Sequence, residues 1–220
     1  LNTGSNNAQR SSPTQVGTDT NWDELIGGIG YDFMGKKTDG TLWTWGRNLN
    51  GSMGQNQSSS GGLLGFSSPV QIPGTTWGKV VCGSNTNFAL KTDGTLWGWG
   101  QNYRGALGLN YHPGSPGSIG SQSSPTQVGT DTTWSDLAAG LYNCLAVKTD
   151  GTLWSWGYAN GNVLGLNQPE SDQKSSPTQV GTDTTWRSIY TNHSSAFGTK
   201  TDGTMWSWGY NGRSGAGILG

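Results

Sequence analysis

The nine-residue phrase Thr-Asp-Gly-Thr-Leu-Trp-x-Trp-Gly occurs four times in this chain of 220 residues. It stands at 38–46, 92–100 and 149–157, and at 201–209 with Met205 in place of leucine. The copies lie roughly 55 residues apart, and self-similarity at such a long period is typical of solenoids, propellers and other repeat architectures. The repeat therefore restricts the fold class before any single residue is interpreted.

Two other elements recur in step with this phrase. A lone tryptophan with an apolar residue three positions later occurs once in each unit, so the 12 tryptophans fall three to a unit. A Ser-Ser-Pro phrase stands at 11–18, 123–130 and 175–182, with a variant at 67–72. We expect one domain over 1–220, with repeats at approximately 11–66, 67–122, 123–174 and 175–220, the last completed by 1–10.

The two ends of the chain read as parts of one further repeat. Ile218-Leu219-Gly220 followed by Leu1-Asn2 matches the internal run Ala106-Leu107-Gly108-Leu109-Asn110. The repeat frame is therefore circularly continuous. A closed ring, a head-to-tail assembly of copies, or an in-phase excerpt of a longer array would each produce it.

Within each unit the pattern has the period of two that is typical of strands. In Leu-Trp-x-Trp-Gly the two tryptophans share a face, and a second strand precedes the motif, as at 88–91 and 144–148. Asp-Gly between them predicts a hairpin with a type I′ turn. Pro-Thr-Gln-Val and Trp-x-x-Leu predict two more strands.

Four short antiparallel strands in each unit cannot bury both of their faces alone. Sheets arranged radially, face against face, bury the tryptophans between neighbours, which is the β-propeller arrangement. The expected fold is all-β: a propeller of four four-stranded antiparallel blades, either self-closed or part of a larger or multi-chain ring.

The run Trp99-Gly100-Gln101-Asn102-Tyr103-Arg104-Gly105-Ala106-Leu107-Gly108 resembles the repeat of the regulator of chromosome condensation family. The resemblance covers essentially the whole chain and implies a propeller, typically seven-bladed; four repeats fall short of that number. The family repeat often carries a histidine shortly before the hairpin, where this chain has Asp32, Thr86, Asn143 and Ser195. Functions in the family include nucleotide exchange on a small GTPase, enzyme inhibition, UV-B sensing and adhesion-type binding, so the fold does not fix the function.

The composition of the chain limits the kinds of partner that it can bind. The net charge is −1 and charged residues make up 11% of the chain, which argues against nucleic acid, because phosphate binding relies on clustered lysine and arginine. No apolar run approaches the ~20 residues of a membrane span, so no membrane insertion is expected. Cys82 and Cys144 occupy different repeat offsets and are interpreted as separate buried thiols.

The chain shows no catalytic or metal-binding constellation. His112 and His193 lie in different units without a cysteine at metal-ligand spacing, and no serine stands in a nucleophile elbow. Seven of the 13 carboxylates recur with the repeat and are interpreted as turn residues: Asp39, Asp93, Asp150, Asp202, Asp19, Asp131 and Asp183. We expect no enzyme activity, no cofactor and no metal.

What differs between the units is where a binding face can be built, because loops on a rigid frame carry recognition. The variable segments 47–66, 101–122 and 158–174, together with the tail, hold tyrosine and arginine, which are common at interface hot spots. The predicted binding rim is Arg47, Tyr103, Arg104, Tyr111, His112, Tyr158, Tyr210 and Arg213. A second variable rim precedes the hairpin strand at Tyr31/Asp32, Asn85/Thr86, Tyr142/Asn143 and His193/Ser194.

Two alternatives stay open for these features. The variable segments are either binding loops or passive solvated loops. The tryptophans are interpreted first as blade packing, with sugar stacking and light sensing as alternatives; their equal use in every unit favours packing.

The sequence favours a non-catalytic binding or structural module, a surface-exposed adhesion or receptor-binding propeller of the bacterial or phage tail-fibre kind, at an extracellular or virion surface. The alternative is a protein–protein regulator, such as a small-GTPase exchange factor or an enzyme inhibitor. The expected partner is a protein or glycan on the loop rim, or another copy of this chain that completes a ring.

Overall fold

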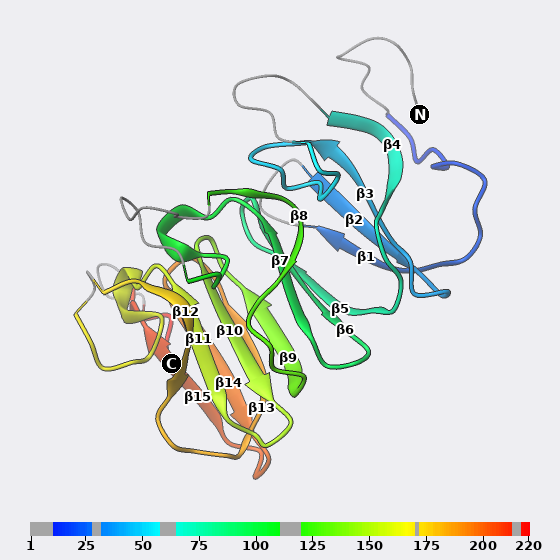
Figure 1. The fold of residues 1–220 in the computed structure, drawn as a ribbon. Helices are drawn as coiled ribbons and strands as arrows, with labels where there is room; N and C mark the ends of the chain where they lie inside the picture. The colour runs from blue at the N-terminus through cyan, green and yellow to red at the C-terminus, as the bar shows by residue number, and fades with distance from the viewer. Residues whose placement is uncertain (1–10, 28–31, 58–64, 111–119, 170–171, 213–216) are drawn as a thin grey trace.

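The computed structural model describes residues 11–27, 32–57, 65–110, 120–169, 172–212 and 217–220. Over these ranges the chain is all-β, with fifteen strands in four antiparallel sheets and two single-turn 3-10 helices. The sheets stand one after another along an arc (Figure 1). The predicted radial stack of antiparallel blades is confirmed.

Each sheet is here called a blade and is numbered in chain order. Blade 1 comprises β1 (Trp22–Gly27), β2 (Asp32–Lys37), β3 (Leu42–Arg47) and β4 (Gly65–Ile72). Blade 2 comprises β5 (Trp77–Cys82), β6 (Thr86–Lys91), β7 (Leu96–Gly100) and β8 (Gln122–Gln127). Blade 3 comprises β9 (Trp134–Ala139), β10 (Asn143–Lys148), β11 (Leu153–Gly157) and β12 (Lys174–Val180). Blade 4 comprises β13 (Trp186–Thr191), β14 (Ser195–Lys200) and β15 (Met205–Gly209), and the turns η1 (Tyr103–Gly105) and η2 (Asn160–Asn162) follow β7 and β11.

The repeated Asp-Gly hairpin has a specific side-chain basis. In blade 3, Asp150 Oδ1 accepts hydrogen bonds from Thr152 N at 3.0 Å and from Thr152 Oγ1 at 2.7 Å. The same threonine hydroxyl accepts the indole N–H of Trp154 at 2.9 Å. These bonds recur in all four blades, so the phrase Asp-Gly-Thr-x-Trp is a hydrogen-bonded unit that fixes the hairpin. The bonds from threonine lower the pKa of each turn aspartate.

The predicted type I′ turn is wrong, although the hairpin itself is confirmed. A type I′ turn needs positive φ at both central residues, and only the glycine adopts it, as at Gly151 with φ +79°. Gly151 N donates to Lys148 O, and Lys148 N donates to Thr152 O. This pattern is a three-residue loop that ends in a left-handed glycine, the next most common hairpin connection.

The blades are offset from the sequence repeats. The Ser-Ser-Pro phrase that opens a repeat forms the fourth strand of the preceding blade, as β8 does beside β7 and β12 beside β11. The chain then crosses to the first strand of the next blade. Contacts between blades involve these first strands, such as β5 with β9 and β9 with β13, which places them toward the inside of the arc.

One predicted strand does not form. Residues 13–16 repeat the sequence of β8 and β12, yet 13–16 are exposed and in no strand. Blade 4 correspondingly holds three strands within the described residues. A strand needs a neighbour to satisfy its backbone groups, and the chain folds 13–16 away from β15.

The core lies between the blades. Three buried clusters each draw on two adjacent blades: the first joins blades 1 and 2, the second joins 2 and 3, and the third joins 3 and 4. Trp99 and Trp156 are fully buried in them. Within a blade the three indoles meet edge to face, as Trp134 does with Trp154 at 5.9 Å and with Trp156 at 6.3 Å between ring centroids. The tryptophans at the internal junctions are therefore blade packing, whereas Trp206 in blade 4 is 50% exposed.

The first part of each variable segment also serves this packing. Trp156 Nε1 donates to Ala106 O at 3.0 Å, and Trp208 Nε1 donates to Val163 O at 2.8 Å. Each acceptor lies in the turn that follows the third strand of the preceding blade. These turns therefore connect neighbouring blades through hydrogen bonds. The interpretation of the variable segments as passive solvated loops does not hold for this part of them.

We expect Trp156→Ala to lower the free energy of unfolding by about 3–5 kcal/mol, because it leaves a large cavity in the core and removes the partner of Ala106 O. Denaturant unfolding followed by circular dichroism measures this. A change within ~0.5 kcal/mol, the range of ordinary surface substitutions, would contradict the placement of this indole between blades.

Candidate binding rim

The two variable rims that the sequence suggested are one edge of the structure. Tyr158 N donates to Tyr142 O at 2.9 Å, and Tyr210 N donates to Ser194 O at 2.8 Å. Each bond joins the residue after Trp-Gly to the residue just before the second strand of the same blade. This edge, where the second strand of each blade begins and the third ends, is here called the rim.

The predicted rim residues are spread over this edge. Arg47, Tyr158 and Tyr210 each directly follow the Trp-Gly of their blade, and Tyr103 and Arg104 lie in η1. Three other predicted residues lie outside the described residues: Tyr111, His112 and Arg213.

Four side chains from two blades gather on the rim. The ring of Tyr103 lies 4.8 Å from that of Tyr142 and 6.5 Å from that of Tyr158, measured between centroids. The guanidinium carbon of Arg104 lies 5.5 Å from the centroid of Tyr103 and 5.2 Å from that of Tyr158. Tyr103 and Arg104 are exposed, and the other two are half-buried. Tyr103, Arg104, Tyr142 and Tyr158 are here called the Tyr–Arg cluster.

The backbone of Arg104 is strained. Its φ of 57° and ψ of 29° lie in the left-handed region, which costs roughly 1–2 kcal/mol for an ordinary residue and is visited routinely by glycine and at times by asparagine. The matching turns place Asn50 (φ 53°) and Gly161 (φ 63°) there. Blade 2 thus has an arginine at a position where blades 1 and 3 have residues that tolerate this conformation. Backbone strain of this kind is concentrated at functional sites.

The other two described residues of the predicted rim have different surroundings. The Cα of Gly161 in η2 is so close to Tyr210 that a Cβ built on it would lie 2.7 Å from Tyr210 Cβ, so Tyr210 covers the turn of the preceding blade. Arg47 is exposed at the end of β3 in blade 1. The Tyr–Arg cluster itself lies at the junction of blades 2 and 3.

The residue that opens each second strand is structural. Thr86 Oγ1 donates to Gln101 O, Asn143 Nδ2 donates to Asn192 O, and Ser195 Oγ donates to Tyr210 O. Blade 1 has a carboxyl group at this position: Asp32 is buried, and its Oδ2 accepts from Asn87 Nδ2 of blade 2 at 3.3 Å. Burial raises the pKa of Asp32, and the hydrogen bond from Asn87 opposes that rise.

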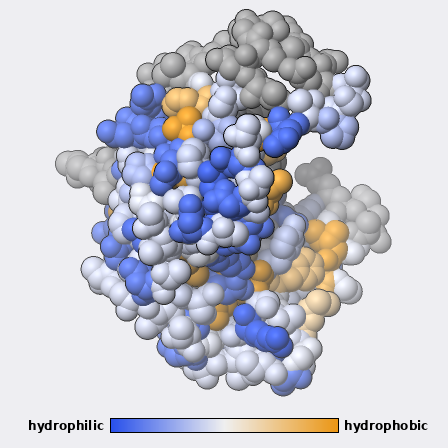
Figure 2. All heavy atoms as spheres, turned by 90° about the vertical axis from the view of Figure 1, so that its right-hand side faces the viewer, coloured by the Kyte–Doolittle hydropathy of each residue, from blue (hydrophilic) through white to orange (hydrophobic). Residues whose placement is uncertain are grey.

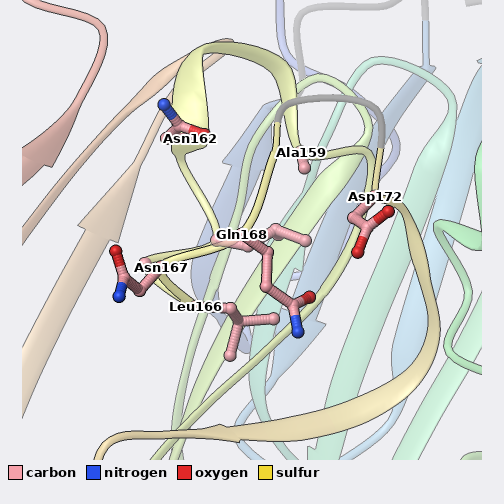
Figure 3. A pocket seen from close by; sticks show the side chains of 8 residues that line it. Ala159, Asn162, Leu166, Asn167, Gln168 and Asp172 are labelled. Carbon is pink, nitrogen blue, oxygen red and sulfur yellow. The ribbon is translucent and has the colours of Figure 1, made fainter.

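The described residues hold few other features suited to chemistry. No three His, Cys, Asp or Glu side chains gather at metal-binding distance among them, and no described helix is long and apolar enough to cross a membrane. A small pocket after β11, lined by residues that include Ala159, Leu166 and Asp172 (Figure 3), has room for about one water molecule. Burial raises the pKa of both cysteine thiols well above the ordinary value. Cys144 is fully buried, which makes a thiol inert, whereas Cys82 keeps some exposed surface.

The sequence profile of the regulator of chromosome condensation (RCC1) repeat matches residues 39–90 and 93–147, and a second profile of the same repeat matches 79–106. Residues 39–147 of this chain are RCC1 repeats. It is 30% identical over 142 residues to the RCC1 domain-containing mitochondrial protein RUG3 of Arabidopsis thaliana, which is 62% of this chain and 29% of RUG3. It is 31% identical over 137 residues to the human protein RCC2, or 59% of this chain and 24% of RCC2.

Solved RCC1 propellers share the fold. Yeast RCC1 (Prp20), solved bound to Kap60, superposes with a TM-score of 0.74 at 21% identity over 91% of this chain and 46% of the yeast chain. Human WBSCR16 gives a TM-score of 0.69 at 22% identity, over 86% of this chain and 48% of that chain. This chain thus spans about half the length of these propellers and less than a third of the curated relatives.

We expect Asp32→Asn to change how stability depends on pH. A folded pKa raised above the unfolded value of 3.8 gives a contribution to stability that is present below the unfolded pKa and is lost as pH rises through the folded pKa. Wild type should therefore lose stability relative to Asp32→Asn as the pH rises from the acid range toward neutrality. Thermal unfolding of both proteins across this range measures the difference, and a difference that is constant or of opposite slope would contradict the assignment.

We expect Arg104→Asn to raise the free energy of unfolding by roughly 0.5–1 kcal/mol, because asparagine relieves the left-handed strain as Asn50 does in blade 1. Arg187, exposed on β13, supplies the matched control: Arg187→Asn should change stability by less than ~0.5 kcal/mol. Denaturant unfolding compares the two variants. A clear loss of stability in Arg104→Asn would mean that the tyrosine contacts outweigh the strain.

Proposed function

We propose that this chain is a non-catalytic, protein-binding segment of an RCC1-type propeller, and that it regulates a protein partner through the Tyr–Arg cluster on its rim. The observation that carries this proposal is the cluster itself. It combines three tyrosines and an arginine from two blades, and one member keeps an unfavourable backbone conformation. Two members lie in the turn η1, and the other two lie directly beside the ends of β10 and β11. Tyrosine and arginine are the residue types enriched where binding energy concentrates.

The chemistry of the cluster suits a protein surface. The planar guanidinium of Arg104 presents donors that match a carboxylate in two parallel hydrogen bonds. The exposed ring of Tyr103 adds apolar area at low entropic cost, because it has few rotatable bonds and already packs on Tyr142. A partner with an acidic side chain beside an apolar patch fits this arrangement.

The relatives favour a protein regulator over an adhesion module. Yeast RCC1 has been solved with Kap60, and its binding to Gsp1p and histones has been described. The relatives also include the human E3 ubiquitin-protein ligase HERC2, of which the matched segment is 2%, so that activity need not belong to the matched repeats. No described feature favours the adhesion reading at a cell or virion surface, which becomes an outcome of the test below.

The test measures binding of the purified chain to a panel of small GTPases and to core histones. We expect one protein of the panel to bind, and Tyr103→Ala and Arg104→Asn each to weaken that binding at least tenfold, which is about 1.4 kcal/mol. Arg187→Asn should bind within twofold of wild type. Nucleotide release from a bound GTPase would show whether the regulation is exchange.

Two results would contradict the proposal. Binding that both rim variants leave unchanged would remove the cluster from the interface. Binding to a glycan array that is lost in the same two variants, without binding to any protein of the panel, would replace the regulator with an adhesion module.

A further inference from the structure

Blade 4 has an open edge where every other blade has a strand. β3, β7 and β11 each pair on their outer side with a fourth strand, β4, β8 or β12. β15 pairs with β14 and carries no fourth strand within the described residues. An exposed edge presents unpaired N–H and C=O groups and acts as a template for another strand.

The chain also holds an unpaired copy of the missing strand. Residues 11–16 are Ser-Ser-Pro-Thr-Gln-Val, identical to 123–128 and 175–180, which form most of β8 and β12. The segment 11–16 is exposed and pairs with no strand in the described part of the chain. Val16 is 42% exposed, whereas its counterpart Val128 is 1% exposed.

The local geometry of this free segment already matches that of its paired counterparts. Thr14 Oγ1 donates to Ser12 O at 3.3 Å, and the matching bonds in β8 and β12 are both 3.2 Å. Gly17, which ends the segment, has a φ of +65°, against +65° and +60° at the two matching glycines. The segment is therefore preorganised for pairing and needs little ordering when it adds to an edge.

The outer faces of blade 1 and blade 4 correspond to the two sides of an internal blade junction. At each internal junction the tryptophan-bearing face of one blade packs on the opposite face of the blade before it. The tryptophan-bearing face of blade 1 exposes Leu25 (75%) and Phe33 (48%). The opposite face of blade 4 exposes Tyr190 (63%) and Met205 (74%), which line an apolar hollow with Phe197. The counterparts of Tyr190 and Met205 in blade 3, Ala138 and Leu153, are buried against blade 4.

Hydrophobic residues do reach the surface of the chain, as Figure 2 shows from the right-hand side of Figure 1. Each exposed end face repeats one half of an interface that is already formed three times inside the chain. The partner that fits both ends is therefore another set of the same blades.

We propose that a second copy of this chain binds head to tail, with its residues 11–16 adding to β15 as the fourth strand of blade 4. The register follows from blade 3, where Leu153 pairs with Val180, Trp154 with Gln179 and Ser155 with Thr178. The corresponding pairs are Met205 with Val16, Trp206 with Gln15 and Ser207 with Thr14. The tryptophan-bearing face of blade 1 in the incoming copy then covers Tyr190 and Met205.

The chain's own 11–16 does not serve as this strand. Figure 1 shows the N-terminal end of the described chain and β15 at opposite ends of the arc, and the arc superposes on about half of larger propellers. Two arcs that exchange strands reciprocally give eight blades, within the four to eight that propellers use. Each junction is head to tail, and a two-fold axis relates the two junctions, so the ring closes after two copies and no edge is left open.

The experiment is the solution mass of the 220-residue chain, measured by light scattering, together with variants at each side of the junction. Val16→Asp places a charge where the paired valine is buried, and Met205→Asp does the same on β15; neither side chain packs in the core of the isolated copy. We expect wild type at twice the chain mass and both variants at the chain mass. Val16→Ile and Met205→Leu are matched controls, because Ile72 and Leu153 occupy these positions in other blades, and both controls should remain dimeric.

Mixing the two monomeric variants tests the direction of the contact. One Val16→Asp chain and one Met205→Asp chain can form one intact junction, so the mixture should recover a dimer that neither variant forms alone. A monomeric wild type, an assembly of more than two copies, a dimer that survives both aspartate variants, or a mixture that stays monomeric would each overturn the proposal. Circular dichroism of the variants confirms that they are folded, and none of the substitutions touches the rim.

Discussion

Everything in this structure depends on the packing of one blade's tryptophans against the back of the blade before it. A four-stranded sheet is too thin to bury large indoles on its own, so the blade gains stability only when a second sheet covers it. Trp99 and Trp156 show how completely this happens inside the arc, where both are fully buried and each donates its indole N–H to a carbonyl of the preceding blade. Each repeat is therefore stable only when it packs against a neighbouring repeat.

This dependence separates the residues that repeat from those that do not. The aspartate, threonine and tryptophan of the hairpin form the same hydrogen bonds in all four blades, so their repetition reflects packing and not a site. Variation is tolerated at the rim, where strand ends meet solvent. The Tyr–Arg cluster appears there, at the junction of blades 2 and 3, and Arg104 keeps a conformation that Asn50 and Gly161 adopt more easily. Because Arg104 is strained and the equivalent residues of blades 1 and 3 are not, this part of the rim is where a binding partner is expected.

The same dependence explains the two ends of the arc. The faces of blade 1 and blade 4 expose side chains whose counterparts are buried at the internal junctions. Within the described residues, β15 also lacks the neighbour that every other third strand has. A repeat fold leaves such half-interfaces wherever the stack stops. Their chemistry is that of the internal junctions, which is why another set of the same blades is the natural occupant.

The sequence by itself determined the blade: the period, the hairpin, the strands of three blades and the tryptophan faces follow from repetition and from alternation along a strand. Even the meeting of the two rims can be counted from the hairpin, because residues equally distant from Asp150 along β10 and β11 face each other. Tyr142 and Tyr158 continue that series. Local patterns could not predict the turn type of the Asp-Gly hairpin, in which only the glycine, and not both central residues, has a positive φ. Nor could they show that residues 11–16 pair with no strand in the described part of the chain, since strand formation depends on a neighbour and not on the segment alone. The meeting of Tyr103 with Tyr142 and the burial of Asp32 against Asn87 were decided only by the tertiary structure, because each joins side chains from two blades whose spacing is set by how the sheets stack.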